Sequence, residues 1–69
     1  MIAALKIQEQ IGMAIKQSGM TQAKIAKELG ISQQVVSSYM RGEKMPALDT
    51  FANLCQLLDL DANDILCIR

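Results

Sequence analysis

Apolar residues recur along this chain at helical rather than strand spacing. No stretch alternates apolar and polar residues over several positions, and valine, threonine and aromatic residues are sparse, so strands are not expected. The spacing predicts a first helix from about residue 2 to Gln17, ended by Ser18 and Gly19. Its inward stripe, with intervals of 3, 4, 3 and 1, is Ala4, Ile7, Ile11, Ala14 and Ile15.

Two short helices joined by a very tight turn are predicted next. Thr21 offers an N-cap hydroxyl for a second helix from Gln22 to about Leu29, and Gly30 ends that helix. Ser32, only two residues further on, is the N-cap for a third helix from Gln33 to about Arg41. The residues expected to face inward are Ile25, Ala26 and Leu29 from the second helix and Val36, Tyr39 and Met40 from the third.

A fourth and a fifth helix complete the pattern. The fourth begins near Ala47, with Asp49 in its first turn, where the helix dipole favours an acid. Asp61, with Asp64 three residues on, resembles a capping box for a short fifth helix at about 62–66. The apolar stripe of the fourth helix is expected to be Leu48, Phe51, Leu54, Cys55 and Leu58. Five helices without a strand predict an all-α fold, a compact five-helix bundle that forms a single domain over residues 1–69.

Composition narrows the chemistry that this domain can perform. The chain has no histidine, its acids are scattered and its glycines form no phosphate loop, so no enzyme, cofactor or metal site is expected. Apolar runs are too short for a membrane span, and the first residues lack the basic region of a signal peptide. Cys55 and Cys67 form no CxxC pair and are expected to be buried or idle thiols of a reduced, cytoplasmic protein; a redox or intermolecular disulfide is the alternative.

The formal net charge of 0 hides a division along the chain. Up to Ala47 there are six basic and three acidic residues, which gives +3. From Leu48 onward there are four aspartates and Arg69, which gives −3. The first two-thirds of the chain can therefore face phosphates, whereas the aspartates of the last third partly serve helix starts.

The second and third helices have the features of a helix-turn-helix. In QAKIAKELGISQQVVSSYMR, which starts at Gln22, Ala26 is small where the two helices must cross and Gly30 stands where the turn needs a positive φ. No proline interrupts either helix. The chain resembles the phage repressor and Cro type of helix-turn-helix domain, the XRE family, from about Leu5 to Leu66. The most specific part of the resemblance is the longer segment MTQAKIAKELGISQQVVSSYMRGEKMP, which is followed by ALDTFANLCQLLDLDANDIL.

This resemblance implies a transcription regulator, most often a repressor, that binds double-stranded DNA as a homodimer with its third helix in the major groove. With Val36, Tyr39 and Met40 inward, a 100° step per residue turns Gln34, Ser37, Ser38 and Arg41 outward, and Gln33 lies at the N-terminal edge of the helix. We expect the base-reading residues to be Gln33, Gln34, Ser37 and Ser38. Glutamine pairs with adenine through one donor and one acceptor, and a Gln-Gln pair opens the third helix of some phage repressors. Contacts to the DNA backbone are expected from Thr21, Gln22, Ser32, Arg41 and Lys44, although any single lysine can simply be a solvated charge.

The dimer interface is expected at the C-terminal end of the chain. Ile65, Leu66, Cys67 and Ile68 follow a nearly complete bundle, and the resembled family often dimerises through this region; ordinary core packing is the alternative. A two-fold dimer would place the two third helices about 34 Å apart and require a palindromic operator.

The chain departs from the family pattern in its charges. Family members often pair an arginine of the first helix with an acid of the third, and these positions hold Gln10 and Met40 here. Many relatives also carry a basic residue where Ile15 stands. Few phosphate-neutralising groups remain, which predicts a shallow salt dependence. Two other functions stay open: an antitoxin of a toxin–antitoxin pair, and a protein-interaction module of the same fold.

Overall fold

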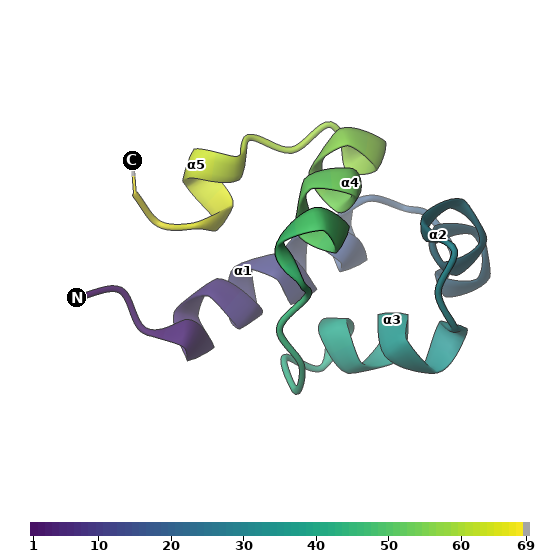
Figure 1. The fold of residues 1–69 in the computed structure, drawn as a ribbon, viewed down its shortest axis with the longest axis horizontal. Coiled ribbons are helices and arrows are strands. Elements are labelled where there is room, and N and C mark those ends of the chain that lie inside the picture. The colour runs from purple at the N-terminus through teal and green to yellow at the C-terminus, as the bar shows by residue number, and fades with distance from the viewer. Residues whose placement is uncertain (69) are drawn as a thin grey trace.

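The computed structural model describes residues 1–68; Arg69, the single basic residue of the acidic last third, lies outside them. Within this range the chain forms five helices and no strand (Figure 1). The helices are α1 (Ala4–Gln17), α2 (Gln22–Leu29), α3 (Gln33–Met40), α4 (Leu48–Leu58) and α5 (Ala62–Ile65). Helix α1 packs against α3 and α5, and α2 packs against α3 and α4. The predicted all-α bundle is confirmed.

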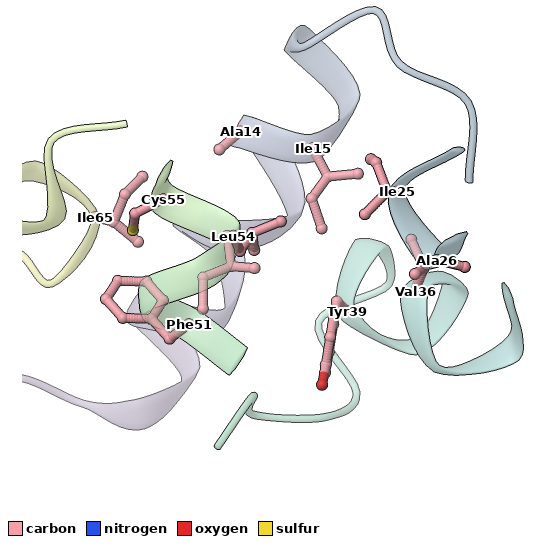
Figure 2. Close-up of a cluster of buried hydrophobic side chains, with 11 residues drawn as sticks. Ala14, Ile15, Ile25, Ala26, Val36, Tyr39, Phe51, Leu54, Cys55 and Ile65 are labelled. Carbon is pink, nitrogen blue, oxygen red and sulfur yellow. The ribbon is translucent and has the colours of Figure 1, made fainter. Parts of the chain in front are cut away.

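The core lies where these helices meet, and its side chains are mostly aliphatic (Figure 2). Helices α1, α2 and α3 bury the expected inward residues Ile11, Ile25 and Val36 almost completely. From α4 and α5, Leu54 and Ile65 enter the same cluster. Buried apolar area is the main stabilising contribution in so small a bundle.

The helix ends differ from the prediction by one or two residues. Helix α1 begins at Ala4 rather than at residue 2, and Ala3 precedes it without a side-chain cap. Ala4 is exposed and does not belong to the core stripe, which begins with the half-buried Ile7. Helix α3 ends at Met40 and α5 at Ile65, one residue earlier than predicted in each case.

Besides Ala4 and Ile7, four residues assigned inward by the pattern are wholly or partly exposed: Leu29, Met40, Leu48 and Leu58. Leu48 is the first residue of α4 and is 82% exposed, because the core stripe of this helix starts one turn later at Phe51. Met40, at the end of α3, is half-buried and packs against the core from its edge.

Gly12 allows a close approach between α1 and α3 that the sequence pattern did not reveal. It is buried, and a Cβ atom there would lie 2.7 Å from the Met40 carbonyl oxygen and 3.3 Å from that of Tyr39. Only glycine lets the backbone of α3 come this near. The last turn of α3 is therefore held directly against α1.

Candidate nucleic-acid interface

The tight turn that orients α3 is built from the residues that the sequence indicated. Gly30 has a φ of 68°, a left-handed conformation that favours glycine, and the Ile31 N–H donates back to the Ala26 carbonyl across 3.0 Å. The Ser32 hydroxyl then accepts from the Val35 N–H across 3.2 Å and starts α3. Helix α2 ends and α3 begins within three residues, which fixes the angle between them.

Helix α3 presents a polar face outward because its apolar face is fixed in the core. Val36 and Tyr39 are almost fully buried, as expected. Gln33 and Gln34 are exposed on the first turn, and Ser37 and Ser38 follow one turn later in half-buried positions. In Figure 1, α3 lies along one edge of the molecule, and the connection from α4 to α5 lies on the opposite side.

The hydroxyl groups of Ser37 and Ser38 are both hydrogen-bonded within the protein. Ser37 Oγ donates to Oε1 of Gln22 across 2.6 Å, and this contact links α3 to the first residue of α2. Ser38 Oγ donates to the Gln34 carbonyl oxygen of its own helix across 3.1 Å. Sequence reasoning missed both bonds, because spacing places a side chain on a face but does not show which neighbour it binds. Each serine keeps only acceptor capacity for an external partner.

The N-termini of α2 and α3 offer hydrogen-bond donors. Thr21 Oγ1 accepts from the Lys24 N–H across 3.1 Å, as Ser32 does from Val35. Each hydroxyl accepts in these caps, so its own proton remains a donor for an anion. Unpaired backbone N–H groups of a first helical turn also favour an anion such as phosphate.

One of the two basic side chains expected to follow α3 is paired with an acid. Arg41 Nε lies 3.1 Å from a carboxylate oxygen of Glu43, and both side chains are more than half exposed. The sequence analysis counted Glu43 only as one of three acids up to Ala47, and the structure places it against one of the two cations expected to follow α3. Lys44 is exposed in the following loop.

Burial changes the acidity of two core groups. It raises the pKa of the Tyr39 hydroxyl above its ordinary value, and the nearby Asp49 carboxylate adds to this effect. Burial likewise raises the pKa of the Cys55 thiol, with a smaller contribution from Asp61. Cys55 is a buried free thiol and Cys67 a half-buried one, and a raised pKa keeps the thiol of Cys55 in its less reactive protonated form.

The four residues expected at a dimer interface have different environments. Ile65 is only 7% exposed and packs in the core of its own chain, which matches the alternative of ordinary core packing for that residue. Leu66 and Cys67 are half-buried, and Ile68 is 60% exposed. Only the last three can contact a second chain without opening the core.

Other exposed apolar side chains lie outside the predicted interface. Leu48 and Met45 are exposed just beyond α3, and Ile2 and Leu5 at the start of the chain. A groove of about 240 Å³ adjoins Met45 and Leu48 and lies between α1, the start of α4 and Leu66. The amphipathic pattern assigned Leu48 to the core, so the sequence did not predict that Leu48 is an exposed apolar residue.

Comparison with known proteins identifies the family of this domain. A family model described as helix-turn-helix matches residues 11–65, from the middle of α1 to the end of α5. The chain belongs to this family, the helix-turn-helix domains of the phage repressor and Cro (XRE) type. The family is one of DNA-binding transcription regulators and is generally non-enzymatic. No curated protein and no solved structure matches the chain.

Residues 1–68 contain no helix that is both long and apolar enough to traverse a bilayer. Over the same range, histidine, cysteine, aspartate and glutamate side chains nowhere gather in a group of three that could hold a metal ion.

Proposed function

We propose that this protein is a sequence-specific transcriptional repressor that binds a palindromic DNA operator as a homodimer, with α3 in the major groove. The observation that carries the proposal is the pair Gln33 and Gln34. Both are exposed on the first turn of a helix whose other face is fixed in the core. A helix that presents its N-terminal residues in this way suits insertion into the groove.

The chemistry of the exposed face favours reading of adenine. A glutamine side chain can accept from adenine N6 and donate to N7 at once, and each such pair discriminates by about 1–3 kcal/mol. Ser38, whose hydroxyl proton is engaged with the Gln34 carbonyl, can accept from a base amino group. The outer face of α3 carries no acid that would repel DNA.

Contacts to the DNA backbone would fix the register of α3. Donors at the N-terminal ends of α2 and α3 include the hydroxyls of Thr21 and Ser32 and the amide of Gln22. Arg41 and Lys44 follow the other end of α3. Phosphate contacts on both sides of the groove position the helix, and base contacts supply the specificity.

A dimer would form through a surface that we call the terminal apolar surface, made of Ile2, Leu5, Met45, Leu48 and Ile68. Both chain termini lie at one end of the molecule, and α2 lies at the other (Figure 1). A second copy seated at the terminal end leaves α2 and the first turn of α3 uncovered for DNA. Leu66 lines the groove beside Met45 and Leu48, which supports a contribution of the C-terminal residues to this surface.

The proposal is tested by selection from random duplex DNA near physiological salt. Wild type is compared with a Gln33→Ala/Gln34→Ala double variant, and Gln10→Ala/Gln17→Ala on α1 is the matched control. Wild type and control are expected to enrich one palindromic motif, and the double variant to lose or relax it. A folded wild-type protein that enriches no motif would contradict the proposal and favour a function in binding another protein.

A further inference from the structure

The two helices of the motif are joined by a hydrogen bond between side chains 15 positions apart. Ser37 Oγ donates to Oε1 of Gln22 across 2.6 Å in a partly buried position. A carboxamide is planar, and its oxygen and NH₂ group point in different directions. Because Oε1 is engaged with Ser37, the NH₂ group of Gln22 is turned away from Ser37 with its orientation fixed.

The neighbouring serine shows that this contact is not the default for the helix. Ser38 donates to the carbonyl oxygen four residues earlier in α3, the usual local bond of a helical serine. Ser37 instead reaches across to α2. While that bond is kept, the Ser37 proton is not available for a base.

We propose that Ser37 is a positioning residue and not a base reader. Its hydroxyl holds Gln22 so that the NH₂ group of Gln22 donates to a phosphate at the N-terminus of α2. This inference rests on the proposed function, since the phosphate belongs to bound DNA. It changes the expected role of Ser37 from base reading to positioning, and it identifies the NH₂ group of Gln22 as the donor to the phosphate.

We expect the Ser37 hydroxyl to have a measurable effect on DNA affinity. A free glutamine side chain loses rotamer freedom when it binds, and prior immobilisation removes part of that cost. A hydrogen bond to a charged acceptor is stronger than one between neutral groups. Loss of the oriented contact is therefore expected to weaken DNA binding about tenfold.

The test uses the full chain, the duplex that wild type selects and a double-mutant cycle. Ser37→Ala and Gln22→Ala are each expected to weaken binding about tenfold, and the double variant about tenfold as well, since both remove one contact. Glutamine is uncharged and releases no counterions, so the salt slope and the base preference should stay as in wild type. Ser37→Thr retains a hydroxyl and should restore affinity, and Ser38→Ala serves as the matched serine control.

Several outcomes would overturn the inference while leaving the proposed function in place. Effects of the two single changes that multiply to about a hundredfold would show independent roles. A relaxed preference at one base pair in Ser37→Ala would make Ser37 a base reader. A lower thermal midpoint with unchanged DNA affinity would make the bond purely structural. If the wild-type protein binds no duplex at all, the proposed function fails and this inference fails with it.

Discussion

The ion pair between Arg41 and Glu43 sets the charge next to the C-terminal end of α3. Its Nε–Oε1 distance is 3.1 Å, and both groups are solvated. Such an exposed pair contributes little to folding stability. It does compete with a phosphate for the same guanidinium, so its main consequence concerns DNA binding.

Glu43→Gln is expected to tighten DNA binding by about three- to fivefold, because the acid no longer competes for Arg41. The slope of log affinity against log salt should steepen by about one unit, since one more phosphate is neutralised. Titrations at several salt concentrations measure both quantities. Glu28→Gln is the charge-matched control, because Glu28 lies beside Asn53 and Gln56 in the groove between α2 and α4. Equal effects of the two changes would show that only the total charge matters.

Tyr39 is a second group whose environment has a measurable consequence. Its pKa is raised, mainly by burial, so the folded protein keeps the phenol protonated at a pH where the unfolded chain ionises. The free energy of unfolding should therefore decrease as the pH rises above about 10, the ordinary tyrosine value. Tyr39→Phe lacks this contribution and should lose less stability over the same range.

The experiment has a direct optical readout, because the chain has a single tyrosine and no tryptophan. Phenolate absorbance of the folded protein should appear at a higher pH than in denaturant. Urea unfolding of wild type and Tyr39→Phe at matched pH gives the stability difference. Phenolate formation at the same pH in folded and denatured protein would refute the expectation.

At the scale of elements, α3 is held by contacts on two sides. Its apolar residues Val36 and Tyr39 lie in the core (Figure 2), and its last turn touches α1 at Gly12. The turn at Gly30 fixes its other end. A helix of only eight residues is marginal in isolation, so these contacts maintain the proposed DNA-reading face.

Gly12→Ala tests the α1–α3 contact. Alanine normally stabilises a helix interior relative to glycine by about 0.5–1 kcal/mol. Here the new Cβ would lie 2.7 Å from a backbone oxygen of α3, and we expect a net destabilisation of about 1–3 kcal/mol. Thermal or urea unfolding measures it, with Glu9→Ala at an exposed position of α1 as the control. An increase in stability would show that the two helices can separate without cost.

The same elements show how far the sequence could predict the structure. Helix α2 was predicted with its observed bounds, because Thr21 and Gly30 are strong local start and stop signals. The exposure of Leu48 could not be predicted. Helical periodicity shows which residues share a face of α4, but not how far along that face the neighbouring helices cover it. The Ser37–Gln22 bond and the Gly12 contact also depend on the angle between helices, which no local pattern specifies. The outward position of Gln34 followed from periodicity and that of Gln33 from its place at the N-terminal edge of the helix, whereas their role in DNA reading remains a prediction.

At the scale of the whole molecule, the aspartates between α4 and α5 lie away from the proposed DNA-binding face (Figure 1). The connection that carries Asp59 and Asp61 lies across the molecule from α3 (Figure 1). A formal net charge of 0 is therefore compatible with a DNA-binding side.

Leu48→Asp is expected to dissociate the dimer, because it places a charge at the most exposed residue that adjoins the groove of the terminal apolar surface. Sedimentation equilibrium should then show a monomer, and affinity for the palindromic duplex should decrease at least about tenfold, while binding to a single half-site is retained. Met13→Asp changes another exposed apolar residue, on the later half of α1, and should leave the dimer intact. A Leu48→Asp protein that remains a dimer would place the interface elsewhere.

The most direct test of the central claim follows the side-chain amides of the seven glutamines in ¹⁵N-labelled protein during titration with the selected duplex. If α3 enters the major groove, the NH₂ signals of Gln33 and Gln34 should shift strongly, and that of Gln22 should shift with them. Gln10 and Gln17 lie on the α5 side of α1, and Gln56 lies between α2 and α4, so their signals should stay in place. Shifts confined to Gln10, Gln17 or Gln56, with Gln33 and Gln34 unchanged, would contradict DNA reading by α3.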